Sequence, residues 1–219
     1  MQLAPERERV AAVSRELAER ELVLGTAGNV SARDGDRVAI TPTGAILSEL
    51  QAADVAVVDL EGNQLDGPLE PTSEIELHLS VLRRYETAGV VHTHSPMATA
   101  LSCVLDEVPC VHYAMLALGG AVPVAPYTTF GTPALADSVV AALEGHTAVL
   151  MANHGAVTHG ATVEDAMELS LLLEWACGVY WHAAQVGSPR ALDEHERAAV
   201  IKAVTDSSYG ATRAAGEQT

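Results

Sequence analysis

Cysteine, basic residues and long apolar runs are all scarce in this chain of 219 residues. Its three cysteines form no CxxC pair, so the sequence indicates neither a disulfide framework nor a thiolate metal site. Lysine and arginine together number 12 against 29 acidic residues, and the resulting net charge of -17 opposes binding to nucleic acid or to an anionic membrane. No charge-free apolar run reaches the roughly 18 residues of a membrane span, and residues 1–20 lack the apolar stretch of a signal peptide. We therefore expect a cytoplasmic protein in a reducing compartment.

The rest of the composition is typical of a globular chain. Hydrophobic residues make up 48% of it, so we expect a single domain over residues 1–219, with a mobile tail from about residue 207. Apolar periodicity predicts strands over residues 37–40, 55–60, 89–94, 122–125 and 147–153. It predicts helices over residues 5–20, 71–85, 96–105, 132–143, 163–186 and 193–204, with Trp175 and Trp181 packed in the core. This alternation places the fold in the α/β or α+β class without fixing the strand order.

Three histidines end two of the predicted strands. Because side chains alternate across a strand, His92 and His94 point to the same face. His154 follows the strand over residues 147–153 and could complete a set of three. Three nitrogen ligands leave one coordination position open for water or substrate, as in catalytic zinc sites. A same-face histidine pair alone is more often an ordinary polar face, so the metal interpretation depends on the rest of the chain.

Three short polar segments offer neutral donors from which an anion site can be built. Their candidate residues are Gly28, Asn29, Thr43, Gly44, Thr72 and Ser73. A helix that begins near residue 72, with Thr72 or Ser73 as its N-cap, would add a favourable dipole, although such segments are usually only turns. Asn29-Val30-Ser31 is interpreted as a loop. Glu74, in the first helical turn, is either a capping charge or a base beside the metal.

Eight motifs occur in a fixed order: GTAGNVS (25–31), TPTG (41–44), SE (73–74), HTH (92–94), HY (112–113), GG (119–120), TFG (129–131) and NHG (153–155). Together they resemble the class II aldolase/adducin family, from about residue 8 to about residue 210. Within it they are most similar to the aldolases of L-fuculose 1-phosphate. The resemblance implies a three-layer α/β fold with a central, mainly antiparallel sheet flanked by helices. It also implies a homotetramer with active sites at subunit interfaces.

The same resemblance implies a reaction. It implies reversible cleavage of L-fuculose 1-phosphate, or of a related deoxy-ketose phosphate, to dihydroxyacetone phosphate and a short aldehyde such as L-lactaldehyde. One Zn²⁺ per subunit, or another divalent transition metal in its place, would neutralise the enediolate without a Schiff base. This suits a chain whose single lysine is Lys202.

The resemblance also implies roles for individual residues. The zinc ligands would be His92, His94, His154 and Glu74, and Glu74 would move off the metal to act as the base. The phosphate would be bound by Gly28, Asn29, Thr43, Gly44, Thr72 and Ser73. Two tyrosines would complete the catalytic set: Tyr113, reaching into a neighbouring subunit's site, and Tyr209 in the C-terminal tail.

Several alternatives stay open at this point. An L-ribulose-5-phosphate 4-epimerase, or a sugar-phosphate dehydratase or decarboxylase, would share the metal site, and HTHS at residues 92–95 resembles the epimerases as well. HYAMLALGG at residues 112–120 follows the aldolase pattern and favours an aldolase. An adducin-like interaction domain without catalysis is the alternative of another class. The intact histidines and Glu74 argue against it.

Overall fold

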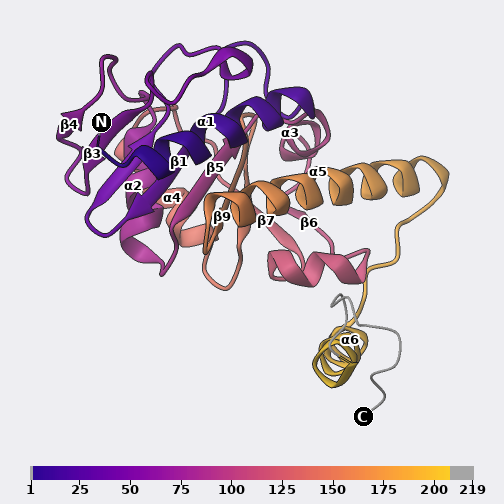
Figure 1. Ribbon diagram of the computed structural model, residues 1–219. Helices are drawn as coiled ribbons and strands as arrows, with labels where there is room; N and C mark the ends of the chain where they lie inside the picture. Colours follow the sequence, from indigo (N-terminus) through magenta and orange to yellow (C-terminus); the bar gives the residue numbers. More distant parts are fainter. Residues whose placement is uncertain (1, 208–219) are drawn as a thin grey trace.

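A nine-stranded sheet forms the middle of the described chain, residues 2–207 of the computed structural model (Figure 1). Its strand order is β4-β3-β2-β1-β5-β9-β8-β7-β6. Neighbouring strands are antiparallel except β7 and β8, which run parallel. The prediction of an α/β fold with a mainly antiparallel sheet is confirmed. The strands are β1 (Asn29–Asp34), β2 (Arg37–Ile40), β3 (Ala56–Asp59), β4 (Gln64–Asp66), β5 (Gly89–Thr93), β6 (Glu107–Val108), β7 (Val122–Ala125), β8 (Ala148–Met151) and β9 (Gly155–Gly160).

Helices cover both faces of this sheet (Figure 1). One face carries α1 (Ala4–Glu19), α3 (Pro96–Ser102) and α5 (Val163–Val186). The other carries α2 (Ile75–Arg84) and α4 (Pro133–Ala142), which pack against each other. The last helix, α6 (Glu194–Ser207), stands apart from these layers and lies next to the short helix η2 (Tyr113–Leu118). A second short helix, η1 (Leu47–Glu49), packs against α1.

Alternation along β5 divides the core between the two faces and places the histidines. Val90 belongs to the cluster that includes Leu79 of α2, whereas Val91 belongs to the cluster that includes Leu17 of α1. Because the side-chain period of a strand is two, His92 points to the same face as Val90, toward α2. The buried strand therefore aims its terminal imidazole at the N-terminus of α2.

The structure corrects the prediction for residues 71–74. Helix α2 begins at Ile75, with Glu74 in the N-cap position, so neither Thr72 nor Ser73 is the N-cap. Contacts with a distant segment explain the late start, because the Thr72 amide donates to the Thr41 carbonyl at 3.0 Å. This long-range bond holds the chain extended where local residue preference favours a helix.

Four strands were absent from the sequence prediction. Asn29-Val30-Ser31, predicted as a loop, begins β1, which pairs with the buried strand β5 on one side and β2 on the other. Strand β9 follows β8 across a short turn, and β4 and β6 have three and two residues. Short or glycine-containing strands give little periodicity, so pairing with neighbours decides them.

The prediction of core positions for the tryptophans is wrong for the described chain. Trp175 is 47% exposed and Trp181 is 42% exposed, although both lie on α5. The buried stripe of α5 includes Leu173, Ala176 and Cys177 and leaves both indole rings outside. Although α5 has 24 residues, no helix in the described part of the chain has the length and apolarity to cross a membrane.

A carboxylate from α5 caps the helix that follows His94. The two oxygens of Glu174 accept hydrogen bonds from the backbone amides of Met97 and Ala98, at 2.8 and 2.9 Å. A negative charge at a helix N-terminus satisfies unpaired amides and interacts favourably with the helix dipole. We expect Glu174→Gln to lower the free energy of unfolding by about 1 kcal/mol. Chemical denaturation measures this loss, and the exposed Glu168→Gln on the same helix, which should have no effect, is the control.

Candidate active site

Three imidazoles meet at the ends of two neighbouring strands. His92 is fully buried at the end of β5, His94 follows that strand, and His154 lies in the turn between β8 and β9. Their candidate ligand atoms all lie within 4.8 Å of one another, and the Nε2 atoms of His92 and His94 are 3.0 Å apart. The Nδ1 atom of His92 lies 2.9 Å from the Ala156 carbonyl, which can only accept a hydrogen bond. That bond places the proton on Nδ1 and leaves the Nε2 lone pair for a ligand.

The turn that carries His154 is shaped by two unusual backbone positions. Asn153 has φ 56°, in the left-handed region that asparagine tolerates better than most residues. Gly155 begins β9 so close to β5 that an added Cβ would lie 2.2 Å from the Thr93 carbonyl oxygen. The strands can therefore approach closely enough to bring His154 to the other two imidazoles.

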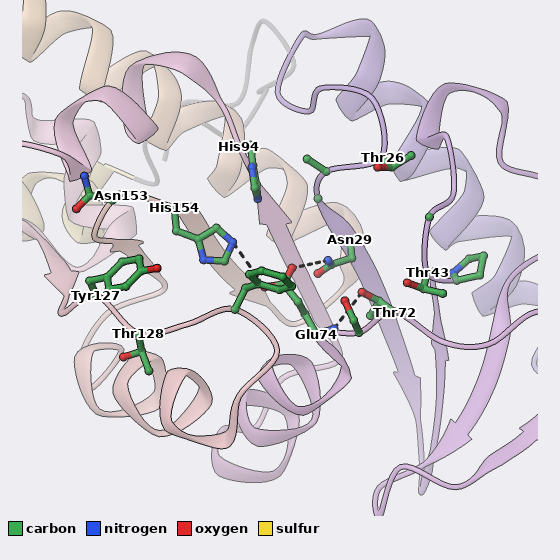
Figure 2. Close-up of a pocket in the computed structure, with 16 residues that line it drawn as sticks. Thr26, Asn29, Thr43, Thr72, Glu74, His94, Tyr127, Thr128, Asn153 and His154 are labelled. Atoms are coloured by element: carbon green, nitrogen blue, oxygen red, sulfur yellow. Dashed lines mark hydrogen bonds and ion pairs between the residues drawn. The ribbon is translucent and has the colours of Figure 1, made fainter.

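Glu74 lies between His154 and Asn29 and joins the histidine group (Figure 2). Its Oε2 lies 3.2 Å from His92 Nε2 and its Oε1 lies 3.6 Å from His154 Nε2. The side-chain amide of Asn29 donates a hydrogen bond to Oε2 at 3.0 Å. Burial opposes the charged form, but His92, Asn29 and His154 outweigh it and hold the pKa of Glu74 well below its usual value. The carboxylate is therefore charged at neutral pH.

The residues present fit a divalent cation. Burial, aided by the neighbouring His92 and opposed by Glu74, lowers the pKa of both His94 and His154 to about 4. These imidazoles are therefore neutral at pH 7, which is the form that binds a metal. Within the described chain, the buried Oε1 atom of Glu74 has no hydrogen-bond partner. Three imidazole nitrogens and a carboxylate oxygen without a donor form a donor set that zinc accepts.

These groups border a cavity of about 470 Å³. Its lining contains all six residues predicted for the phosphate, together with Glu74, His94 and His154. In Figure 2, Thr26 and Thr43 lie on one side of Glu74, and Tyr127 and Thr128 lie on the other. The carboxylate and imidazoles thus lie between a wall of neutral polar turns and a wall formed by residues 127–130.

Of the two predicted catalytic tyrosines, Tyr113 falls within the described residues. It begins η2, is 42% exposed, and has its ring 4.4 Å from that of His112. It is absent from the described lining of the cavity. Tyr209 lies outside the described residues.

Sequence reasoning missed several residues of the site. Tyr127 and Thr128 line the cavity from the segment after β7, and Thr26 lines it beside the predicted phosphate residues. The TFG motif at residues 129–131 was the available signal for the first two. His78, one turn after Glu74 on α2, contacts Asn29 from behind the cavity. Its i+4 spacing from Glu74 was the signal that could have found it.

Comparisons with known proteins agree with this geometry. The family described as Class II Aldolase and Adducin N-terminal domain matches residues 8–181. The 5-methylthioribulose-1-phosphate/5-deoxyribulose-1-phosphate aldolase of Rhodospirillum rubrum is 38% identical over 188 residues, 84% of this chain and 85% of that protein. The 5-deoxy-D-ribulose 1-phosphate aldolase of Bacillus thuringiensis serovar kurstaki is 35% identical over 199 residues, 90% of this chain and 93% of that protein. A solved L-fuculose 1-phosphate aldolase has a TM-score of 0.89 and 31% identity, over 94% of this chain and 98% of that chain.

The family match covers residues 8–181, and the likeness of fold to the solved aldolase covers 94% of the chain. Enzymes of this family use a divalent metal, and the cluster of His92, His94 and His154 could hold one. The predictions of a class II aldolase fold and of an aldehyde-lyase are confirmed. The chain therefore belongs to the class II aldolase and adducin family, as one of its aldolases.

Proposed function

We propose that this protein reversibly cleaves a deoxy-ketose 1-phosphate to dihydroxyacetone phosphate and a short aldehyde, with one Zn²⁺ per subunit. The observation that carries the proposal is the meeting of three imidazoles and a charged carboxylate at one cavity. The preferred substrate is a 5-deoxypentulose 1-phosphate, which would release acetaldehyde, because two relatives are named for such substrates. L-Fuculose 1-phosphate, which would release L-lactaldehyde, is the second candidate.

The protein's own groups supply the proton transfers. The zinc ligands would be His92, His94 and His154, with Glu74 as a fourth at rest, and the bound cation would neutralise the enediolate charge. In the condensation direction Glu74 takes the carbon-bound proton of dihydroxyacetone phosphate, and in cleavage it returns that proton. Oε2 is anchored by Asn29, while Oε1 has no donor within the described chain, so Oε1 is the oxygen placed to accept the proton.

The phosphate end of the cavity is the wall of polar turns. Among the described residues that line the cavity there is no lysine or arginine, so the site must rely on neutral donors. Amides and hydroxyls in such turns can form a nest for an anion without a full positive charge. We assign the phosphate to Gly28, Asn29, Thr43, Gly44, Thr72 and Ser73.

The aldehyde end is the opposite wall, where aromatic rings are prominent. Tyr127 and Phe130 line the cavity and are each 66% exposed, and Thr128 lies between them in sequence. Rings favour an apolar group over a chain of hydroxyls, because unpaired substrate hydroxyls lose hydrogen bonds to water. This wall supports a deoxygenated aldehyde such as acetaldehyde.

A panel of three substrates tests the proposed function. We expect the zinc-loaded protein to release dihydroxyacetone phosphate from 5-deoxyribulose 1-phosphate with a kcat/KM about 10-fold above that for L-fuculose 1-phosphate. EDTA should abolish both reactions. A coupled reductase assay measures the release. Conversion of L-ribulose 5-phosphate to its epimer without release would instead move the assignment to the epimerases, and inactivity on all three would contradict the proposal.

We further propose that the active unit is a cytoplasmic homotetramer, each subunit a single domain over residues 1–219. Trp175, Trp181 and Tyr113 expose large aromatic surfaces in the described chain. Such rings are enriched where proteins associate. The described cysteines are unpaired, which supports a reducing compartment. In this assembly Tyr113 enters a neighbouring cavity and protonates the aldehyde oxygen during condensation, and Tyr209 is assigned as a second tyrosine of that site.

Mixed oligomers test whether the site is shared between subunits. Glu74→Gln and Tyr113→Phe should each be nearly inactive alone, since each removes one proton-transfer group. Unfolded together and refolded in equal amounts, they should regain about a quarter of wild-type activity, because that fraction of sites combines an intact Glu74 with an intact neighbouring Tyr113. Tyr180→Phe on α5 is the matched control and should remain active. Absence of recovery, with mixed oligomers demonstrated by mass spectrometry, would contradict a shared site.

A further inference from the structure

A buried histidine outside the predicted site lies at the back of the cavity. His78 is fully buried on α2, one helical turn after Glu74, and none of its surface reaches solvent. Burial is the main cause that lowers its pKa to about 3, with His92 adding to the effect and Glu74 opposing it. A buried polar group must be hydrogen-bonded to avoid a penalty, so the partners of this ring define its role.

Four side chains form a continuous hydrogen-bonded series behind the cavity. Ser31 Oγ lies 2.8 Å from His78 Nδ1. His78 Nε2 lies 2.5 Å from Asn29 Oδ1. Asn29 Nδ2 in turn lies 3.0 Å from Glu74 Oε2. Asn29 and Ser31 lie on one face of β1, and Glu74 and His78 lie one turn apart at the start of α2. The series therefore joins these two elements.

The chemistry of the acceptors fixes the direction of each hydrogen bond. The Asn29 carbonyl oxygen can only accept, so His78 Nε2 must carry the proton. His78 Nδ1 is then an acceptor, and the Ser31 hydroxyl is its donor. The charged Glu74 carboxylate also only accepts, and the Asn29 amide supplies the hydrogen. The proton positions are assigned from this network, in which each donor faces an acceptor.

With these hydrogen-bond directions, the Asn29 amide cannot turn over without losing its hydrogen bonds to His78 and Glu74. If the Asn29 amide turned over, its oxygen would face the Glu74 carboxylate and its NH₂ group would face a ring nitrogen that already carries a proton. Both new contacts would be repulsive. His78 therefore keeps a donor, rather than an acceptor, against Oε2 of the carboxylate.

We propose that His78 is a positioning residue that acts through Asn29 to hold the Glu74 carboxylate in its productive orientation. This inference rests on the proposed role of Glu74 as the base. The Asn29 bond occupies Oε2 and leaves Oε1, which has no donor within the described chain, turned toward His154. Hydrogen bonds from residues behind a reactive group fix its orientation, and their loss typically costs about 10- to 100-fold in activity.

Two substitutions at position 78 separate hydrogen bonding from packing. His78→Leu replaces the imidazole with an apolar side chain of similar bulk and removes the hydrogen bonds to Ser31 and Asn29. We expect it to lower kcat about 10- to 100-fold. Its KM should stay within about 3-fold of wild type, because His78 is absent from the described lining of the cavity and the residues assigned to the phosphate, other than Asn29, are untouched. His78→Gln keeps an N–H near the Nε2 position and should recover most of the lost kcat. Equal impairment of both variants, or a wild-type kcat in His78→Leu, would overturn the proposal.

A double substitution tests whether the effect passes through Asn29. If it does, the double variant His78→Leu/Asn29→Ala should have the same kcat as Asn29→Ala alone. The reason is that Asn29→Ala already interrupts the hydrogen-bonded series. Multiplied losses in the double variant would mean that His78 acts in another way. If His78→Leu fails to fold, Ser31→Ala interrupts the same hydrogen-bonded series and should also lower kcat with KM unchanged. A wild-type kcat in Ser31→Ala would then overturn the proposal.

A measurement without turnover distinguishes this proposal from the proposed function. NMR of protein labelled with nitrogen-15 at histidine measures the tautomer, and the two signals missing from the His78→Gln spectrum are those of His78. They should show a protonated Nε2 and an unprotonated Nδ1. A proton on Nδ1 would overturn the proposed hydrogen-bonded series even in an active enzyme. If the protein has no aldolase activity but His78 shows the expected tautomer, the proposed function fails while the hydrogen-bonded series stands.

Discussion

Glu74→Gln should lower kcat about 1,000-fold while the protein keeps its fold, its oligomeric state and its metal. The expectation follows from position and charge together. The carboxylate lies 3.2 Å from His92 Nε2, its pKa is held below the usual value, and Oε1 has no donor within the described chain. Glutamine keeps the shape and can still accept from Asn29, but it cannot take a proton from carbon. The release of dihydroxyacetone phosphate, with metal analysis of the same sample, measures the effect.

Glu76→Gln is the matched control for this substitution. Glu76 lies two residues further along α2, where its side chain pairs with Arg83 at the surface. Its loss should leave kcat unchanged and alter stability by no more than about 0.5 kcal/mol. If Glu74→Gln keeps a wild-type kcat, Glu74 is not the base, and a loss of bound metal in that variant would show that the carboxylate serves mainly as a ligand.

His94→Asn should remove the metal and, with it, the activity. The substitution keeps a polar side chain of smaller size but leaves two of the three imidazoles. We expect zinc affinity to fall by roughly 100-fold or more, because even changes to groups that only orient ligands cost 10- to 100-fold. Activity at trace zinc should fall about 1,000-fold, and part of it should return at high zinc. Metal content by atomic absorption and kcat at graded zinc concentrations measure both effects.

His182→Asn, at an exposed position on α5, is the control for the loss of an imidazole. It should bind zinc as the wild type does. A His94→Asn protein that retains one tightly bound zinc per subunit would show that His94 is not a ligand, whatever its activity. Full zinc binding with no activity would instead assign His94 a role in the reaction itself.

The histidine cluster was predictable in part from local pattern, and its interpretation as a metal site came from the resemblance of the whole motif set. Alternation along one strand places His92 and His94 on the same face, and the structure shows both near His154 as expected. The polar segments were recognisable as donors for a similar reason, since their composition alone indicates turns. The structure brings all six predicted phosphate residues to one cavity. Periodicity alone, however, could not choose between α/β and α+β, because strand order depends on long-range pairing.

The errors lie where distant contacts override local preference. Thr72 was predicted to cap α2, yet its amide bonds to the Thr41 carbonyl and the helix begins at Ile75. Trp175 was predicted in the core because indole rings are usually buried, but the buried stripe of α5 is filled by smaller residues. An apolar pattern indicates how much of a helix's surface is to be buried. It does not indicate whether the same chain or another subunit packs on that surface.

The residue types of the site can be read from the sequence: three imidazoles, one acid near the start of a helix, and neutral donors in place of basic residues. Those are properties of composition and of spacing within single elements. How the acid is held depends on the packing of elements that are distant in the sequence. The series from Ser31 through His78 and Asn29 to Glu74 joins β1 to α2 through pairs of residues that lie 45 to 49 positions apart in the sequence. No local period encodes such a contact, because hydrogen-bond direction between side chains exists only after the sheet and helix have packed.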